Sequence, residues 1–177
     1  GPVPMGALFS KASTYSGPLR RLERKRNMDI RKATMEDIDL LVRYRKQMYL
    51  DNYDRVIDFE DQMEDFFREK MADGSLVQWF VEENGEVVGT GGVLFYRVPP
   101  SFGNHSGRKG HVANMWTRTD HRRQGIATKL LDLCVAEAQK RNVTQLDLGA
   151  SRLGRFVYEK YGFQSADDEM VMNIPQE

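Results

Sequence analysis

The sequence of 177 residues lacks several features that mark whole classes of protein. It has a single cysteine, Cys134, which excludes an internal disulfide. Its three histidines, His105, His111 and His121, do not have the spacing of a metal-binding motif. No apolar run approaches the roughly 20 residues of a membrane-spanning helix, and no signal peptide is recognisable. We therefore expect no bound metal and no membrane partner, and the cytoplasm is the default location.

Charge is balanced over the whole chain, with 26 Lys and Arg against 26 Asp and Glu, but it is unevenly distributed. Residues 1–27 carry six Lys or Arg and one Glu, a net charge of +5. Residues 28–177 then carry 20 Lys or Arg against 25 Asp or Glu, a net charge of −5. A mildly acidic domain lacks the basic face of a nucleic-acid binder, so we expect no nucleic-acid partner.

The first 27 residues are rich in Gly, Pro, Ser and Arg and lack apolar periodicity. Four interpretations stay open. The Gly-Pro start is typical of a protease-cleavage scar, the interpretation that we favour, while the acid-poor composition resembles an organelle transit peptide. Residues 5–10 fit a myristoylation pattern, but Met5 is not the first residue here, so we regard this match as accidental. Finally, a basic tail could dock on an acidic neighbour. We therefore divide the chain into a tail, 1–27, and one domain, 28–177.

Hydrophobic periodicity and turn signals predict a mixed α/β order of elements in the domain. The expected strands are 29–33, 76–82, 86–97, 111–117, 143–148 and two short ones within 163–174. One helix is expected to start after Thr34, and three more are expected over 58–72, 126–141 and 154–161. Asn84-Gly85 is typical of a hairpin turn, and the glycines of the following strand indicate a bulge or a close approach. Residues 98–109 read as a loop that covers an acceptor site.

The segment before the third expected helix carries an anion-binding pattern. It reads Arg122, Arg123, Gln124, Gly125, Ile126, Ala127 and Thr128. The first turn of a helix has backbone N–H groups without internal partners and a partial positive charge, and together these bind phosphate. The segment lacks the Gly-Lys-Ser/Thr end of a P-loop and the Gly-x-Gly-x-x-Gly of a dinucleotide site. It therefore predicts a pyrophosphate site of another type, the alternative being a solvated charged turn.

A second segment, from Ser151 to Phe163, reads Ser-Arg-Leu-Gly-Arg-Phe-Val-Tyr-Glu-Lys-Tyr-Gly-Phe. With the upstream pattern Arg-x-x-Gly-x-Ala, it resembles the GNAT superfamily of acyl-CoA-dependent N-acyltransferases, whose closing helix ends in Tyr-Glu-Lys-x-Gly-Phe. The resemblance is specific over residues 110–163. It implies an α/β (α+β) fold with a mostly antiparallel central sheet flanked by helices. The two middle strands, near 113–117 and 145–148, would splay apart to form a cleft.

The resemblance implies acetyl-CoA as the cofactor. It places the cofactor against the strand before the loop, the loop itself and the closing helix: Met115, Trp116, Thr117, Arg122, Arg123, Gln124, Gly125, Ile126, Ala127, Thr128, Ser151, Arg155 and Tyr158. Ser151 departs from the Asn that is common in the family. Arg155 could equally form a surface salt bridge, and Met115 and Trp116 could equally belong to a buried strand.

Tyr158 matches the tyrosine that, in many family members, points at the cofactor sulfur. A phenol with an ordinary pKa near 10 is protonated at neutral pH and can neutralise a departing thiolate. The alternative is a tyrosine that packs against the sheet, which is the role we expect of Tyr161.

The general base is less clearly marked. Many family members carry Glu where this sequence has Ala113, and the adjacent Asn114 can form hydrogen bonds but cannot take a proton. His111 is the candidate base because histidine has the intrinsic pKa closest to neutrality. Glu82, Tyr44 and a water that passes protons to solvent stay open as alternatives.

The resemblance and the site residues predict an acetyl-CoA-dependent N-acetyltransferase that acts on the amine of a small molecule. Direct attack is expected, because Cys134 lies on the apolar stripe of a helix and is not placed to carry an acyl group. Two alternatives stay open: acetylation of a peptide or protein amine, and a CoA-binding sensor or partner module without turnover. Family members are commonly dimers, so the resemblance also implies a homodimer.

Overall fold

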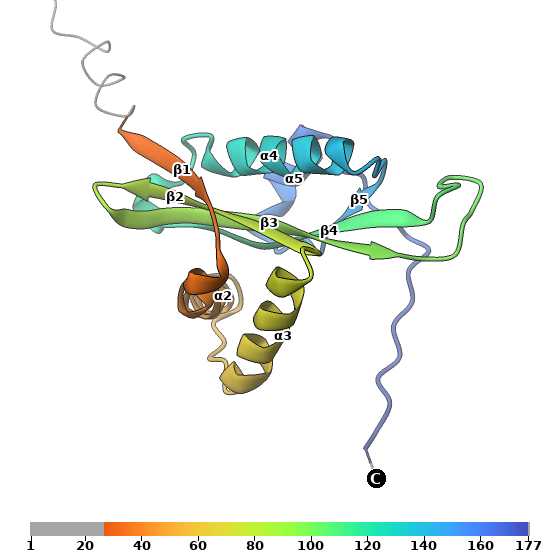
Figure 1. Cartoon of the computed structure of the whole chain (residues 1–177), viewed down its shortest axis with the longest axis horizontal. Helices are drawn as coiled ribbons and strands as arrows, with labels where there is room; N and C mark the ends of the chain where they lie inside the picture. The colour runs from red at the N-terminus through yellow and green to blue at the C-terminus, as the bar shows by residue number, and fades with distance from the viewer. Residues whose placement is uncertain (1–26, 177) are drawn as a thin grey trace, which may run out of the picture.

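The structure is a computed structural model that describes residues 27–176, so the interpretations of the basic tail fall on residues outside it. The elements in chain order are β1 (Met28–Lys32), η1 (Met35–Asp37), α2 (Ile38–Tyr53), α3 (Glu60–Ala72), β2 (Leu76–Glu83), β3 (Glu86–Arg97), β4 (Arg108–Thr117), η2 (Thr119–His121), α4 (Ile126–Lys140), β5 (Leu146–Asp147) and α5 (Arg155–Tyr161). Figure 1 shows one twisted sheet between two layers of helices.

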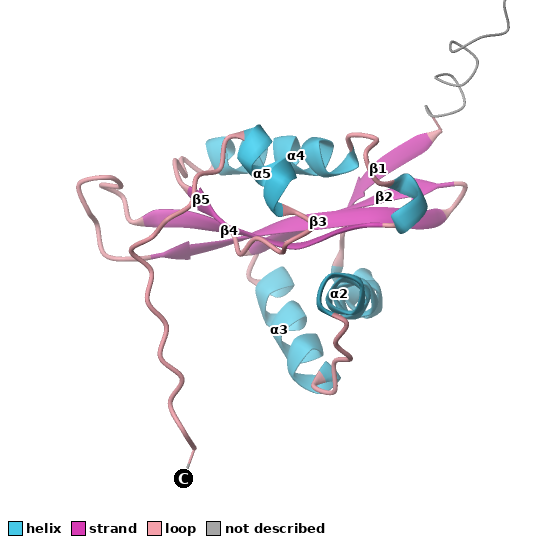
Figure 2. Cartoon of the chain, turned by 180° about the vertical axis from the view of Figure 1, so that it is seen from behind, coloured by secondary structure: helices cyan, strands magenta, loops and turns pink. Residues whose placement is uncertain are grey.

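The five strands follow the order β1-β2-β3-β4-β5 across the sheet. The first four pair antiparallel, and β5 pairs parallel to β4. Helices α2 and α3 cover one face, and α4 and α5 cover the other (Figure 2). This arrangement confirms the predicted mixed, mostly antiparallel sheet flanked by helices.

Local sequence signals form the turns that they predict. Asn84 and Gly85 have φ values of 52° and 80°, the left-handed pair that a two-residue hairpin turn needs. Thr34 starts the first helical segment with a capping box, in which its hydroxyl accepts from Glu36 N at 3.3 Å and its own N–H donates to Asp37 at 2.7 Å. Both signals act locally, and neither depends on the rest of the fold.

Two hydrophobic clusters form the core, one on each face of the sheet. Phe67 and Phe80 are fully buried in the cluster under α2 and α3. Leu130, Leu131 and Cys134 are fully buried in the cluster under α4. Burial raises the pKa of the Cys134 thiol to about 12, so it remains a thiol at neutral pH and acts as a small apolar core residue.

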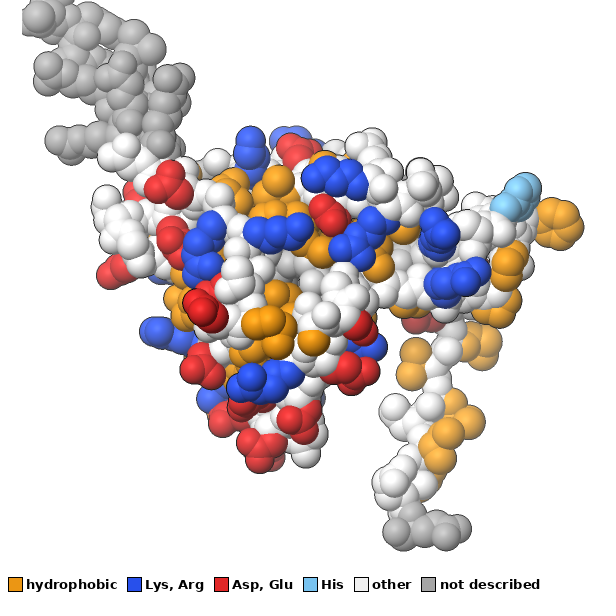
Figure 3. All heavy atoms as spheres, viewed as in Figure 1, with side chains coloured by type: hydrophobic (Ala, Val, Ile, Leu, Met, Phe, Trp, Pro, Cys, Tyr) orange, Lys and Arg blue, Asp and Glu red, His pale blue; other side chains and the backbone are white. Residues whose placement is uncertain are grey.

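The prediction of two short strands within 163–174 is wrong, because residues 162–176 contain no strand. The edge strand β5 has only two paired residues and offers little backbone for another strand to join. Met170, Val171, Met172 and Ile174 are 72–94% exposed. This segment extends away from the sheet in Figure 1, and Figure 3 shows its hydrophobic side chains uncovered.

No helix within residues 27–176 combines the length and the apolar character needed to cross a membrane.

Candidate active site

Strands β4 and β5, the last two strands of the sheet, separate after a short pairing. Their parallel pairing is limited to Gly110 with Leu146 and His111 with Asp147. Beyond His111, β4 continues to Thr117 with no strand beside that edge among residues 27–176. The separation confirms the predicted splay and leaves backbone groups of β4 available to an extended ligand, as in β-strand addition.

A bulge marks the start of this unpaired stretch. Thr90 pairs with Trp116 while Gly92 pairs with Ala113, so Gly91 faces two residues of β4. One of these, Asn114, has a φ of 59°. A Cβ at Gly91 would lie 2.2 Å from the sulfur of Met115, so a larger residue there would force the Met115 side chain to move. The bulge predicted from the glycines of β3 is confirmed.

A chain of buried hydrogen bonds holds the bulge from one face. Arg45 donates to Asn114 Oδ1 at 2.8 Å, and Asn114 Nδ2 donates to Gln78 Oε1 at 3.3 Å. Gln78 then donates to the hydroxyl of Thr90 at 2.7 Å. Because both ends of its amide are engaged, the side chain of Asn114 fixes the shape of β4 at this point.

The N-terminus of α4 is open. Gly125 occupies the cap position with a φ of 82° and provides no side-chain cap. The first helical bond runs from Lys129 N to Gly125 O at 3.0 Å, and the N–H groups of residues 125–128 make no hydrogen bond within 27–176. A Cβ at Gly125 would meet nothing within 4 Å. The geometry fits an anion such as pyrophosphate, which would satisfy these donors and the helix dipole.

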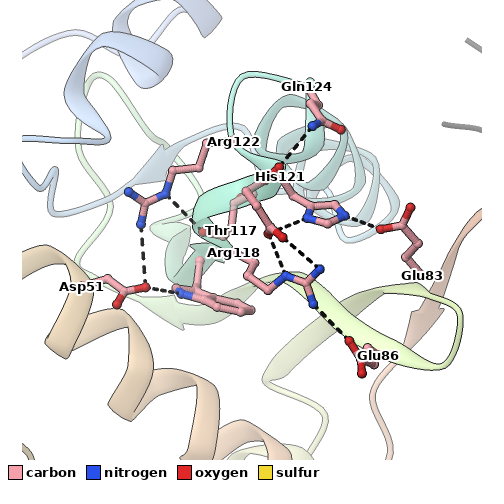
Figure 4. A network of polar contacts seen from close by, with 10 residues as sticks. Asp51, Glu83, Glu86, Thr117, Arg118, His121, Arg122 and Gln124 are labelled. Carbon is pink, nitrogen blue, oxygen red and sulfur yellow. Dashed lines mark hydrogen bonds and ion pairs between the residues drawn. The ribbon is translucent and has the colours of Figure 1, made fainter. Parts of the chain in front are cut away.

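Ion pairs fix the segment that leads to this helix (Figure 4). His121 bridges Asp120, at 2.7 Å, and Glu83 of β2. Arg118 binds Asp120 at 2.7 Å and Glu86 at 3.2 Å. The hydrogen bond from Arg118, followed by that from His121, lowers the pKa of Asp120 to about 2. The network attaches the start of the loop to the β2–β3 hairpin.

Arg122 points back toward β4 and α2 (Figure 4). Its Nε donates to the carbonyl of Thr117 at 3.2 Å, and its guanidinium lies 3.7 Å from Asp51. Asp51 also accepts from the indole of Trp116 at 2.8 Å. Arg122 therefore lies at the end of the free edge of β4. Arg123, with a φ of 60°, completes the turn.

The two tyrosines of α5 have different surroundings. Tyr161 donates to Asp132 of α4 at 2.7 Å, which anchors one helix to the other. Tyr158 packs against the core under α4, and its hydroxyl makes no hydrogen bond within the described residues. Burial, with smaller effects of Tyr53 and Cys134, raises the pKa of Tyr158 to about 12. Its proton is therefore retained at neutral pH and not shared with another side chain of the described chain.

The remaining two predicted residues of the closing segment make local contacts. Ser151 accepts a hydrogen bond from Gly154 N at 3.1 Å and so supports the turn before α5. Arg155 is exposed and contacts Glu159 at 3.4 Å and Ser165 at 3.1 Å. Their roles in cofactor binding stay predictions.

A cavity of about 320 Å³ lies between the sheet and helices α2 and α3, on the face of the sheet away from α4 and α5. Its lining includes Arg45, Phe59, Gln62, Met63, Phe66, Phe67, Leu76, Leu94, His111, Ala113 and Asn114. Three of these residues come from β4, next to its free edge. No residue of the predicted covering loop, 98–109, lines the cavity. Helix α3 covers it instead, so the prediction that this loop covers the site is wrong for this cavity.

His111 reaches the cavity with one ring nitrogen engaged. Its Nδ1 contacts Asp147, which also accepts from the hydroxyl of Tyr96 and lies 3.4 Å from Lys109. Burial raises the pKa of a carboxyl, but the hydrogen bonds from His111 and Tyr96 outweigh it and hold the pKa of Asp147 below its ordinary value. An ionised Asp147 accepts from Nδ1–H, and Nε2 is then left able to accept a proton.

Sequence reasoning missed Asp147 and Arg45. Asp147 follows from the register of the parallel pair, which aligns it with His111. The signal for Arg45 was its place at helical spacing among the apolar residues of α2, where a cation is out of pattern. No group of three or more His, Cys, Asp or Glu side chains within residues 27–176 is arranged to hold a metal ion.

The mostly antiparallel sheet with its separated strands and the open helix end beside them define the fold of an acyl-CoA-dependent N-acyltransferase. Residues 39–163 match the model of the acetyltransferase (GNAT) family, and the chain belongs to this family.

Solved structures and a curated relative agree with this assignment. A predicted acetyltransferase with acetyl-CoA from Clostridium acetobutylicum is 43% identical with a TM-score of 0.80, over 82% of this chain and 96% of that chain. A GCN5-related N-acetyltransferase from Ralstonia eutropha JMP134 is 26% identical with a TM-score of 0.77, over 83% of this chain and 98% of that chain. The uncharacterized N-acetyltransferase YsnE of Bacillus subtilis (strain 168) is 28% identical over 101 residues, which are 54% of this chain. The match spans 61% of that relative.

The ion-pair network predicts a pH-dependent stability. The pKa of His121 is raised, mainly by its hydrogen bond to Asp120. Burial lowers this pKa, but the hydrogen bond to Glu83 adds to the upward shift, which prevails. A raised pKa means that this stabilisation is complete below the ordinary histidine pKa near 6.5 and is lost as the pH rises through the folded-state value. We expect wild type to exceed His121→Gln by about 0.5–1 kcal/mol in free energy of unfolding at pH 5.5, with the difference shrinking at pH 9. Urea unfolding at both pH values measures it, and an equal difference at both would contradict the prediction.

Proposed function

We propose that this protein is an acetyl-CoA-dependent N-acetyltransferase that acetylates the amine of a small molecule. The observation that carries the proposal is the position of β4. One face of this strand presents His111 and Ala113 to the cavity, its edge is free where β5 departs, and its end leads into the open N-terminus of α4. A single strand thus joins an acceptor cavity to an anion site.

The residues that would hold acetyl-CoA are those at the free edge of β4 and at the start of α4. The N–H groups of residues 125–128 would bind the pyrophosphate, with Arg122, Arg123, Gln124 and Thr128 beside them, and the backbone of Met115, Trp116 and Thr117 would pair with the extended arm. The solved structure from Clostridium acetobutylicum contains acetyl-CoA and is 43% identical, which supports this choice of cofactor. Acetyl-CoA supplies the acetyl group as a thioester.

The side chains of the chain itself provide the proton transfers. A C–N bond forms as the C–S bond breaks, and the proton leaving the amine goes to His111 Nε2. The hydroxyl of Tyr158, whose pKa of about 12 keeps it protonated, gives its proton to the departing sulfur. Asn114 holds the bulge of β4 in place beside these groups. Cys134 is fully buried, so direct attack on the thioester is favoured over an acyl-cysteine.

Two alternatives have specific observations against them. A CoA-binding module without turnover is favoured by Ala113, where many family members have Glu, but such a module would not need the oriented His111–Asp147 pair beside the cavity. A peptide or protein acceptor would extend beyond a cavity of about 320 Å³, which is at the small end of the range for single small ligands.

The test is acetyl-CoA turnover with a panel of amines, followed by release of free thiol and by mass spectrometry of the product. We expect thiol release that depends on a particular amine and an equal amount of N-acetylated product. Binding of acetyl-CoA without turnover of any amine in the panel would support the CoA-binding module instead.

We also propose a homodimer as the assembly. The support is a row of apolar side chains after α5 that is exposed in the described chain: Met170, Val171, Met172 and Ile174. Exposed apolar rows of this kind mark association surfaces. Light scattering on the full chain checks the assembly, and a monomer at all concentrations would refute it.

A further inference from the structure

The cavity contains one cation that lacks a counter-charge. Arg45 is half-buried and lines the cavity from α2. Its guanidinium donates to Asn114 at 2.8 Å and to the hydroxyl of Tyr49 at 3.3 Å. It also lies over the Tyr49 ring, 5.1 Å from the ring centre. All of these partners are neutral, and the two hydrogen bonds use two of the five N–H donors of a guanidinium.

No acidic side chain of residues 27–176 pairs with the Arg45 guanidinium. No Asp or Glu lines the cavity, and Arg45 forms no ion pair with any residue of 27–176. The other titratable lining residue, His111, is already engaged by Asp147. A half-buried cation beside an apolar cavity is poorly solvated, and a carboxylate brought by a ligand would bind it through charge-assisted hydrogen bonds.

The α3 side of the cavity is mostly apolar. Phe59, Met63, Phe66 and Phe67, from α3 and the residue before it, form this wall with Leu76 and Leu94 from the sheet, and Gln62 is its one polar side chain. Phe and Met side chains accommodate a branched or aromatic side chain, and they provide no counter-charge and no strong hydrogen bond for a charged one. The cavity thus combines a site for negative charge, an apolar wall and a proton acceptor on β4.

We propose that the acceptor is a free amino acid with an apolar side chain, of the phenylalanine or leucine type. Arg45 binds its carboxylate, the α3 wall holds its side chain, and its amino group faces His111. The inference rests on the proposed function, since it names the acceptor of that reaction. A peptide N-terminus is disfavoured, because it carries an amide where Arg45 requires a carboxylate.

The test compares three amines that share one aromatic ring: phenylalanine, phenylalaninamide and phenethylamine. Wild type is expected to acetylate phenylalanine with a kcat/KM at least about tenfold above either of the others. In Arg45→Gln, the ratio of kcat/KM for phenylalanine to that for phenethylamine falls by about ten- to hundredfold, mainly through KM. Comparing ratios cancels differences in amine basicity, and Arg45→Lys, which keeps the charge, restores part of the ratio.

Arg43→Gln is the matched control. Arg43 lies on the same helix, is exposed and contacts the ring of Tyr44 outside the cavity lining, so its removal leaves the ratio unchanged. An equal loss for all three amines in Arg45→Gln, or a wild-type preference for phenethylamine, overturns this inference and leaves the proposed function standing. Absence of turnover with every amine of the wider panel counts against the proposed function itself.

Discussion

Replacing Tyr158 with Phe is expected to lower kcat by about 10²–10³-fold while changing the Kd for acetyl-CoA by less than about threefold. The ring packs in the core under α4, and phenylalanine keeps that packing. The hydroxyl makes no hydrogen bond within residues 27–176, so its loss leaves no partner unsatisfied in the described chain. What is lost is the proton that a departing thiolate needs, because a phenol with a pKa of about 12 holds that proton throughout the neutral range.

Tyr161→Phe provides the matched control on the same helix. Tyr161 donates to Asp132, so its replacement breaks an anchor between α5 and α4. We expect a loss of about 0.5–1.5 kcal/mol in the free energy of unfolding and little change in kcat. Steady-state kinetics and thermal unfolding of both variants separate the two roles. Equal kcat values for Tyr158→Phe and wild type would mean that Tyr158 is a packing residue and that solvent protonates the sulfur.

Local contacts explain why the sequence predicted the open N-terminus of α4. The strand before the loop, Gly125 and the first turn of α4 are consecutive in the chain, so the open helix end follows from residues that neighbour one another. Asn84-Gly85 and the Thr34 capping box were predictable for the same reason. Each depends on the conformational preferences of a few residues rather than on packing between distant ones.

The side chains that line the cavity come together through contacts between distant residues. His111 and Asp147 are 36 positions apart, and Arg45 and Asn114 are 69 apart. The first contact follows from a two-residue strand pairing, and the second from the place where α2 crosses a bulge. The register of the short pairing has no sequence signal. The glycines of β3 predict a bulge but not which side chains meet there. The two strands predicted within 163–174 are absent for a related reason. Residues with β propensity form a strand only where a neighbouring strand edge is available for pairing.

Replacing Gly125 with Glu is expected to weaken acetyl-CoA binding by at least about 100-fold. The substitution combines two costs. Gly125 has a φ of 82°, which a residue with a Cβ adopts at a cost of about 1–2 kcal/mol. Nothing lies within 4 Å of a Cβ at this position, so the new side chain enters open space and places a negative charge beside the N–H groups of residues 125–128. At about 5 Å and an effective dielectric constant near 20, two like charges repel by roughly 3 kcal/mol.

Gly125→Gln isolates the effect of the negative charge on binding. Its side chain has nearly the same size as that of Gly125→Glu, and both must adopt the same left-handed backbone conformation. We expect the Gln variant to bind at least about tenfold more tightly than the Glu variant at low salt, and the gap to narrow as salt screens the repulsion. Calorimetry at two fixed salt concentrations measures both effects, and thermal unfolding verifies that the two variants are equally folded. Equal weakening in both would place the anion elsewhere. The arginines before α4 would then belong to a charged turn, and the separation of β4 from β5 would need another explanation.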